Sequence, residues 1–357
     1  MGRALELAQG VKGSTLPNPA VGAVVVTGDR IVGSGATAPW GQDHAEKTAC
    51  AAAGKNARGA TLYVTLEPCN HTGKTPPCTE AILASGVRKV VVAMTDPNPI
   101  VSGKGIAKLR RTGVTVRTGL LRTEAQRLNE DYCWTIQNRR PWITLKLALT
   151  LDGRIADYRG RSKWITGKEA RGFVHDLRRR HGAVAVGRKT LSVDDPSLTV
   201  RHVQASNPAR IVFTSARDVP RNARFCDHRN PGRRILVISG GPAAAPRIEK
   251  TGDGIERWLI GAKDRNTVMD RFCTMALEQR LSSILVEGGA RFASFLLEHG
   301  WVNRLYCFFG PLLLGGGTDG VSFAAPRALE KACTLYRVEH EGFGPDGMVT
   351  GLLKRER

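Results

Sequence analysis

Apolar positions in the first 140 residues alternate between strand-like and helix-like spacing. Ala20–Val26 is a β-branched run, and Ile31-Val32 is its predicted hairpin return after Gly28-Asp29. Val87–Met94 is almost continuously apolar, which is typical of a strand buried on both faces. Further strands are predicted at 60–66 and 114–116, and helices at 43–53, 78–85, 106–111 and 124–136. Alternating strands and helices predict an α/β layer.

A polar stretch, Gln137–Pro141, ends in a helix breaker and predicts a domain boundary, which gives domains at 1–140 and 141–357. The second domain repeats the α/β pattern. Its strands are predicted at 142–149, 183–186, 209–213, 235–238, 283–286 and 305–309, and its helices at 168–180, 266–279 and 290–298. Gly240–Gly254 is rich in Gly, Pro and Ala and is predicted to be a surface loop.

Composition narrows the class of protein. The 357 residues suit two domains, and a hydrophobic content of 41% excludes a mainly disordered or collagen-like chain. No apolar run approaches the roughly 18 residues of a membrane span, and the first residues do not resemble a signal peptide. We therefore expect a cytoplasmic protein without a membrane partner. The net charge of +21 favours nucleic acid or phosphorylated small molecules as partners, although an arginine-rich solvated surface explains it equally well.

The strongest chemical signal is His44-Ala45-Glu46, followed by Pro68-Cys69 and then Cys78. One imidazole and two thiolates suit zinc, and three protein ligands leave the fourth tetrahedral position for water. His-x-Glu with Pro-Cys is the signature of zinc deaminases, although their second cysteine usually follows more closely. Two plainer interpretations stay open. Asp43-x-x-Glu46 also fits a helix capping box, and the two cysteines also fit buried free thiols.

Other motifs accompany this one along the chain. Those of the first domain are Pro17-Asn18-Pro19-Ala20-Val21-Gly22, Thr65-Leu66-Glu67-Pro68-Cys69, Gly73-Lys74-Thr75-Pro76-Pro77-Cys78 and Asp96-Pro97-Asn98-Pro99. Those of the second are Lys146-Leu147-Ala148-Leu149-Thr150-Leu151-Asp152-Gly153, Trp164-Ile165-Thr166-Gly167, Asp194-Asp195-Pro196 and Val286-Glu287-Gly288-Gly289. With these motifs the sequence resembles the bacterial bifunctional riboflavin-biosynthesis deaminase–reductases over nearly its whole length.

The resemblance implies an α/β chain with an N-terminal cytidine-deaminase-like three-layer domain and a C-terminal dihydrofolate-reductase-like domain. The first would use zinc to deaminate 2,5-diamino-6-(5-phosphoribosylamino)pyrimidin-4-one by hydrolysis. The second would use NADPH to reduce the ribosyl group to a ribityl chain. The partner would thus be a phosphorylated pyrimidine and not a nucleic acid, and the resemblance leaves room for a homo-oligomer.

The resemblance also assigns roles to residues. His44, Cys69 and Cys78 would hold zinc, and Glu46 would be the catalytic proton carrier. Cofactor contacts are implied for Ala148, Trp164, Thr190, Asp194 and Gly289. Substrate contacts are implied for Asn18, His71, Lys74, Asp96 and Asn98 in the first domain, and for Lys146, Ser162, Thr166, Arg178, Leu198, Arg201 and Glu287 in the second.

Ordinary structural explanations compete with some of these roles. Arg178 lies in an arginine run of the kind that usually forms a solvated helix face, Trp164 fits a core position, and Lys146 could face either side of its strand. The chain also departs from the family at Thr37, where a histidine is usual. Gly315-x-Gly317-x-x-Gly320 fits a dinucleotide-binding pattern, but no helix is predicted to follow, so we discount it.

Two other functions fit the zinc motif. A nucleic-acid deaminase acting on tRNA would also suit the net charge, but the second domain carries no recognisable RNA-binding module. A zinc-stabilised binding protein would need a closed site with four protein ligands, and His71 is the candidate for the fourth.

Overall fold

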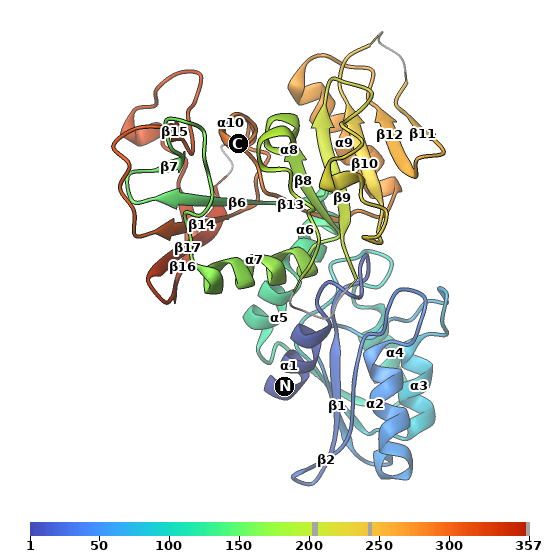
Figure 1. The fold of residues 1–357 in the computed structure, drawn as a ribbon. Helices are drawn as coiled ribbons and strands as arrows, with labels where there is room; N and C mark the ends of the chain where they lie inside the picture. Colours follow the sequence, from blue (N-terminus) through green and yellow to red (C-terminus); the bar gives the residue numbers. More distant parts are fainter. Residues whose placement is uncertain (202–205, 242–244, 355–357) are drawn as a thin grey trace. The chain divides into compact units, whose positions relative to one another are not determined.

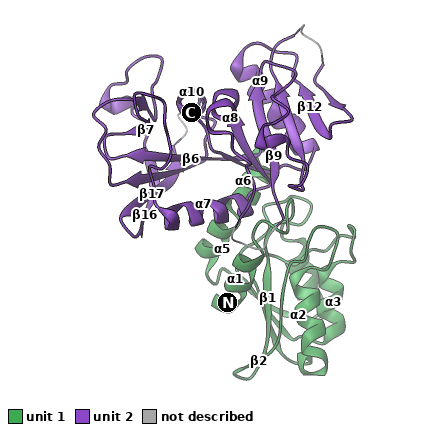
Figure 2. Cartoon of the chain, viewed as in Figure 1, with its two compact units in different colours: residues 1–140 green, residues 141–357 purple. Residues whose placement is uncertain are grey.

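Two large β-sheets organise the chain, and each lies in its own unit. Figure 1 shows the computed structural model, which describes residues 1–201, 206–241 and 245–354. Unit 1 spans Met1–Arg140 and unit 2 spans Pro141–Arg357 (Figure 2). None of the helices in these described ranges combines the length and apolar character that a membrane crossing requires.

Unit 1 is built on a five-stranded sheet with the strand order β2-β1-β3-β4-β5. Strand β1 pairs antiparallel with both β2 and β3, whereas β3, β4 and β5 run parallel. The strands are β1 (Gly22–Thr27), β2 (Arg30–Ala36), β3 (Thr61–Val64), β4 (Lys89–Val92) and β5 (Thr115–Thr118). The helices are α1 (Gly2–Val11), α2 (Ala45–Ala53), α3 (Cys78–Ser85), α4 (Lys104–Arg111), α5 (Arg122–Leu128) and α6 (Glu130–Asn138), with a 3₁₀ turn, η1, at Gly54–Ala57.

Helix α2 packs very closely against the β1–β2 hairpin. A Cβ atom on Gly33 would lie 2.3 Å from the carbonyl oxygen of Ala49, and one on Gly35 would lie 2.6 Å from that of Ala45. Only glycine permits backbones to approach this closely. Helix α1 packs on the other face of the same hairpin, so unit 1 has three layers (Figure 1).

The single helix predicted over Glu124–Ile136 is wrong, because the chain breaks at Asn129 into α5 and α6. Asn129 is fully buried, and its side chain bonds to the backbone of Ala20 in both directions. The amide oxygen of Asn129 accepts from the Ala20 N–H at 2.9 Å, and its Nδ2 donates to the Ala20 carbonyl at 2.8 Å. Helical backbone bonds persist on both sides, from the Asn129 N–H to the Ala125 carbonyl and from the Cys133 N–H to the Asn129 carbonyl, while the side chain anchors the segment that leads into β1.

Unit 2 is built on a ten-stranded sheet with the order β11-β12-β10-β9-β8-β13-β6-β14-β17-β16. The seven strands from β12 to β14 run parallel, and β11, β17 and β16 are antiparallel to their neighbours. The strands are β6 (Trp142–Thr150), β8 (Ala183–Gly187), β9 (Ala209–Thr214), β10 (Arg234–Ile238), β11 (Arg247–Lys250), β12 (Ile255–Leu259), β13 (Ser283–Val286), β14 (Arg304–Gly310), β16 (Leu335–Phe343) and β17 (Asp346–Leu353), with a separate pair β7 (Arg154–Ala156) and β15 (Thr318–Asp319). The helices are α7 (Lys168–Arg180), α8 (Arg188–Asp194), α9 (Arg265–Glu278) and α10 (Ala290–Glu298), with 3₁₀ turns η2 (Arg224–Cys226) and η3 (Leu329–Lys331).

Two hydrophobic cores cover opposite faces of this sheet. Ile143, Leu145 and Leu147 of β6 join the core that contains residues of α9 and α10. Ala148 directly follows Leu147 in β6 and therefore points to the other face, where it packs against the core that contains residues of α7. Because side chains alternate along a strand, Lys146 lies on the α7 face as well. The sequence left this orientation open.

Three parts of unit 2 correct or complete the prediction. The loop predicted over 240–254 is wrong at Arg247–Lys250, which forms strand β11, and residues 242–244 lie outside the described residues. The C-terminal hairpin of β16 and β17 was not predicted. The segment Gly315–Gly320 contains the short strand β15, and the next helical turn in the described chain begins only at Leu329, as expected for a segment that is not a dinucleotide-binding turn.

We predict that Asn129→Ala destabilises unit 1. The substitution leaves a buried N–H and a buried C=O of Ala20 without their partners, which should lower the free energy of unfolding by about 2–4 kcal/mol. Chemical denaturation measures the change. Asn138→Ala on α6 is the matched control, because its exposed side chain donates only to the Trp134 carbonyl. Equal effects of the two substitutions would contradict the anchoring role of Asn129.

Candidate functional site

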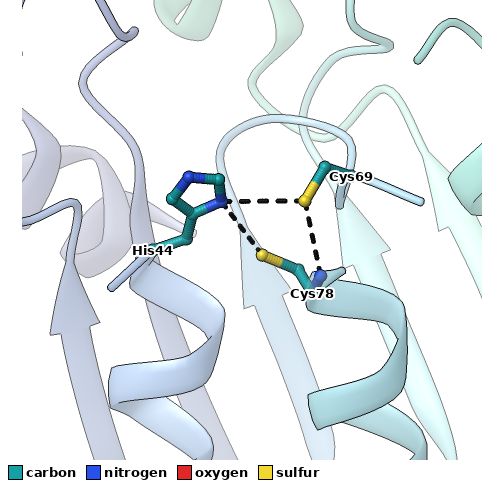
Figure 3. A group of neighbouring side chains, drawn as sticks. All are labelled: His44, Cys69 and Cys78. Atoms are coloured by element: carbon teal, nitrogen blue, oxygen red, sulfur yellow. Dashed lines mark hydrogen bonds between the residues drawn. The ribbon is translucent and has the colours of Figure 1, made fainter. Parts of the chain in front are cut away.

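Three side chains from separate elements of unit 1 converge at one point (Figure 3). His44 is the residue before α2, Cys69 follows β3, and Cys78 begins α3. His44 Nδ1 lies 3.2 Å from Cys78 Sγ and 3.7 Å from Cys69 Sγ. The backbone N–H of Cys78 donates to Cys69 Sγ at 3.3 Å. This bond fixes the Cys69 thiol against the first turn of α3.

The donor set fits a zinc ion. Tetrahedral zinc with bonds of about 2.0–2.1 Å to nitrogen and 2.3 Å to sulfur separates a nitrogen ligand from a sulfur ligand by about 3.6 Å. The two N···S distances of 3.2 and 3.7 Å lie close to that value. Within the described residues His71 does not belong to this group of ligand atoms, so the four-ligand alternative finds no support. Three ligands describe an open, catalytic type of site.

Glu46 lies beside this group and is 4% exposed. It occupies the first turn of α2, where burial raises its pKa to about 7 and the nearby Cys69 thiolate acts in the same direction. The capping-box interpretation is wrong, because the residue before the helix is His44 and the Asp43 carboxylate pairs instead with Lys47 at 2.7 Å. A buried carboxyl group with a pKa near neutrality suits proton transfer.

The two thiols differ in their readiness to bind a metal. The Cys78 thiol donates to Cys69, and this lowers the pKa of Cys69 well below its ordinary value. The same bond, together with burial, raises the pKa of Cys78. Cys69 is therefore the thiol that loses its proton more readily. A bound cation would draw the second proton from Cys78, because metals bind the deprotonated form.

A cavity of about 400 Å³ opens onto the metal-binding group. His44, Glu46 and Cys69 form part of its wall. All the substrate residues predicted for the first domain line it too: Asn18, His71, Lys74, Asp96 and Asn98. Its size falls in the range of small-molecule sites, so the structure brings these predicted residues together around one space suited to a ligand of that class.

Two further residues of the cavity wall were missed by sequence reasoning. The buried Glu67 carboxylate accepts N–H bonds from Asp96 and Gly103 through one oxygen, and from Gly105 and Ile106 through the other. It thus ties the metal-ligand loop to the loop at 96–103 and to the start of α4. The position of Glu67 directly before Pro68-Cys69 was the available signal.

Tyr132 of α6 is the second missed residue. Its hydroxyl donates to Asp96 Oδ1 at 2.9 Å, and the same oxygen accepts the Asn98 N–H at 2.8 Å. Burial raises the pKa of Asp96, while these two hydrogen bonds oppose the shift. The carboxyl group is thereby held in one orientation in the cavity wall. No sequence signal marked Tyr132, because its hydrogen-bond partner Asp96 lies in a different element, distant in sequence.

Thr37, the departure from the family pattern, also lines the cavity and is buried. Its hydroxyl accepts the Val21 N–H at 3.2 Å and lies 3.4 Å from the Val21 carbonyl oxygen, to which it donates. Since the hydroxyl is engaged with the backbone, Thr37 shapes the wall and offers little polar capacity to a ligand.

The second group of predicted residues meets on the α7 face of the unit 2 sheet. Arg178 of α7 makes a forked ion pair with Glu287, at 2.5 and 2.8 Å, and donates to the Thr199 carbonyl at 2.8 Å. Arg178 is 8% exposed, so the solvated-face explanation is wrong. Burial lowers the pKa of Lys146, while the nearby Glu287 opposes the shift, with a smaller contribution from Asp194.

Four more predicted residues pair with one another at this end of unit 2. Ser162 donates its hydroxyl to Asp194 Oδ1 at 2.7 Å. The Gly289 N–H at the start of α10 donates to Thr190 Oγ1 at 3.0 Å, and a Cβ on Gly289 would lie 2.9 Å from that oxygen. Gly288 and Gly289 leave the backbone before α10 without side chains, as in helix starts that bind a phosphate, although the Gly289 N–H is already bonded to Thr190; the predicted cofactor contacts stay predictions.

The remaining predicted residues of unit 2 differ from one another in exposure and in the contacts they make. Trp164 is 66% exposed and stacks on Arg171, so the core explanation is wrong. Thr166 is buried and its carbonyl accepts from Arg171. Leu198 is fully buried among core residues. Arg201 is exposed, and its backbone N–H donates a hydrogen bond to His175 Nδ1. Their predicted ligand contacts stay predictions.

The fold and the His–Cys–Cys group beside a buried glutamate define a zinc-binding enzyme of the cytidine-deaminase type, joined to a second α/β unit. Family comparisons agree. The model of the cytidine and deoxycytidylate deaminase zinc-binding region matches residues 1–94, and that of the RibD C-terminal domain matches residues 141–348.

Individual proteins match over both units. The riboflavin biosynthesis protein RibD of Aquifex aeolicus is 41% identical over 344 residues, covering 96% of this chain and 94% of its own. The same protein of Bacillus amyloliquefaciens is 40% identical over 357 residues, covering 99% and 95%. The solved diaminohydroxyphosphoribosylaminopyrimidine deaminase/5-amino-6-(5-phosphoribosylamino)uracil reductase of Thermotoga maritima superposes with a TM-score of 0.86 at 35% identity, covering 99% and 97%.

The chain belongs to the RibD family of riboflavin biosynthesis proteins. It is a bifunctional deaminase and reductase with a zinc-binding deaminase domain and an NADPH-using reductase domain. The predicted fold class, family, activity and cofactors are confirmed.

We predict that Cys69→Ser reduces zinc binding by more than about 100-fold, since losing an outer hydrogen-bond partner alone costs 10–100-fold. Metal analysis of the dialysed protein should then fall from about one zinc per chain, the stoichiometry expected for a three-ligand site, to a small fraction. Cys133→Ser is the control, because it removes another half-buried free thiol of unit 1. Full zinc retention in Cys69→Ser would exclude Cys69 as a ligand.

Proposed function

We propose that the unit at 1–140 deaminates 2,5-diamino-6-(5-phosphoribosylamino)pyrimidin-4-one by hydrolysis, and that the unit at 141–357 reduces the ribosyl group of the product with NADPH. The observation that carries the proposal is Glu46, buried beside three converging metal ligands on the wall of a 400 Å³ cavity. The printed name of the Thermotoga maritima relative, which covers 99% of this chain, supports the choice of substrate.

In the deaminase, Glu46 is the proton carrier. His44, Cys69 and Cys78 would hold a zinc ion, which would supply water activated for attack at neutral pH. Glu46 accepts a proton from the attacking water at its carboxylate and delivers it to the pyrimidine ring nitrogen. The hydroxyl that the attack adds to the ring carbon then gives up its proton, through Glu46, to the amino group, and the carbon–nitrogen bond breaks to release ammonia. Asn18 and the Asp96 carboxyl, held by Tyr132, would hydrogen-bond the pyrimidine.

In the reductase, the buried charges of the α7 face would hold the ribose. NADPH, when bound, would supply a hydride, and the backbone at Gly288 and Gly289 before α10, beside Thr190, would face its phosphate. Lys146 would donate to the ribose oxygen that gains electron density as the hydride arrives. The forked Arg178–Glu287 pair fixes the wall beside it, so the substrate meets a preorganised group of charges.

The proposal also covers partners and compartment. A cavity of about 400 Å³ suits one phosphorylated pyrimidine, whereas only the net charge of +21 speaks for a tRNA deaminase. A site built on two reduced cysteines works in a reducing compartment, which supports the cytoplasm. A homo-oligomer remains a prediction.

We predict that Glu46→Gln abolishes ammonia release, with a fall of at least about 10³-fold, since general acid–base catalysis alone contributes up to about 10⁴-fold. Zinc content and NADPH-dependent reduction of the deaminated intermediate should stay near wild type. The assay follows ammonia and NADPH separately on one preparation. Deamination at a near wild-type rate would remove Glu46 from the mechanism.

We predict that Lys146→Met lowers NADPH oxidation at least about 10-fold and leaves ammonia release unchanged, because losing one preorganised donor to a developing charge has an effect of about 10²–10³-fold in comparable sites. Lys250→Met on the edge strand β11 is the control for losing one exposed lysine of unit 2. Parallel loss of both activities in Lys146→Met would contradict separate sites in the two units.

A further inference from the structure

An aromatic side chain and a lysine meet at the wall of the deaminase cavity. The Lys74 ammonium lies 3.4 Å from the centre of the Trp40 ring, in the geometry of a cation–π contact. Trp40 lies in the loop between β2 and α2, and Lys74 lies in the loop between β3 and α3. Both side chains line the cavity, so the contact joins two loops that frame it.

Lys74 has a special place among the charges of the cavity. Of the described residues that line it, Lys74 has the one permanently cationic side chain, whereas Glu46, Glu67 and Asp96 all carry carboxyl groups. Apart from a zinc ion at His44, Cys69 and Cys78, the Lys74 ammonium is the permanent positive charge that would attract an anionic group on a ligand, whereas the three carboxyl groups would disfavour it. The position of this ammonium group therefore helps to decide where an anion binds.

The loops leave Lys74 with few other restraints. Its side chain is exposed, and no carboxylate among the described residues forms an ion pair with it. The backbone of Gly41 lies against it, since a Cβ on that glycine would be 3.5 Å from Lys74 Cδ. Lysine side chains carry large rotamer freedom, so a partner that restricts Lys74 lowers the entropy lost when it meets an anion.

We propose that Trp40 is a positioning residue that holds the Lys74 ammonium in place to bind the phosphate of the substrate. This inference rests on the proposed function. The ammonium group covers one face of the indole ring, so Trp40 acts on the ligand through Lys74. Trp40 thereby favours phosphorylated over unphosphorylated substrates at the deaminase step.

The test compares ammonia release from the phosphorylated substrate and from its dephosphorylated form. Trp40→Leu keeps apolar bulk but removes the ring face. It should raise KM for the phosphorylated substrate about 3- to 10-fold, the range expected from losing a partly exposed cation–π contact, and leave kcat within about twofold. KM for the dephosphorylated form should not change. Trp40→Phe retains a weaker aromatic face and should show a smaller rise, again only with the phosphorylated substrate.

A double-mutant comparison isolates the pair. In a Lys74→Met background, Trp40→Leu should have no further effect on KM, because the two residues act as one unit. Lys55→Met, an exposed lysine of η1 away from the cavity, controls for the loss of one charge. Zinc content and thermal unfolding are recorded for every variant. If Trp40→Leu fails to fold, the comparison of Trp40→Phe with wild type on the two substrates decides the question.

Two results would overturn the inference. One is an equal rise in KM with both substrates, and the other is an effect of Trp40→Leu that persists in the Lys74→Met background. Either would mean that Trp40 contacts the pyrimidine or only shapes its loop. Failure of the wild-type protein to release ammonia from the phosphorylated substrate is a different outcome, because it would contradict the proposed function itself.

Discussion

The close contact between α2 and the β1–β2 hairpin is the constraint on which the deaminase site depends. Glycines at positions 33 and 35 let the helix backbone approach the strands to a distance that any side chain would prevent. This approach fixes the start of α2, and with it His44 just before the helix and Glu46 within its first turn. Residues two apart do not share a face of a regular helix. They converge here because one of them lies outside the helix.

The other ligands are positioned by equally local means. Cys69 receives the N–H of Cys78, so the loop that leaves β3 is closed onto the first turn of α3. Glu67, two residues before Cys69, gathers four backbone N–H groups from the next loop and the start of α4. Four N–H groups on one buried carboxylate make a rigid connection. The chain just before the ligand Cys69 is therefore connected directly to the substrate wall at Asp96.

Sequence reasoning succeeded where the pattern is local and failed where it is not. The ligands, Glu46 and most strands follow from residue type and spacing within short windows. The break at Asn129 was missed, and the buried side-chain bonds at this position go to Ala20, more than a hundred residues away, where no short window could reveal them. Tyr132 was missed for the same reason, since its partner Asp96 lies in another element. The orientation of Lys146 required the register of the sheet, which no single strand reveals.

The charge of the chain illustrates the same distinction between global and local properties. A net charge of +21 suggests anionic partners, yet the described lining of the deaminase cavity holds three carboxyl groups and one lysine. The basic excess lies elsewhere on the protein, where solvent and salt screen it. Lys74 is therefore the one permanently charged ammonium group in the described cavity wall that can recognise an anion beside the metal ligands. Unit 2 stabilises its buried charges in another way. Arg178 and Glu287 neutralise each other in a buried forked ion pair beside Lys146. The two units thus place charged groups at their predicted sites in different ways. Unit 1 has the metal-binding group of His44, Cys69 and Cys78, and unit 2 has the buried ion pair of Arg178 and Glu287.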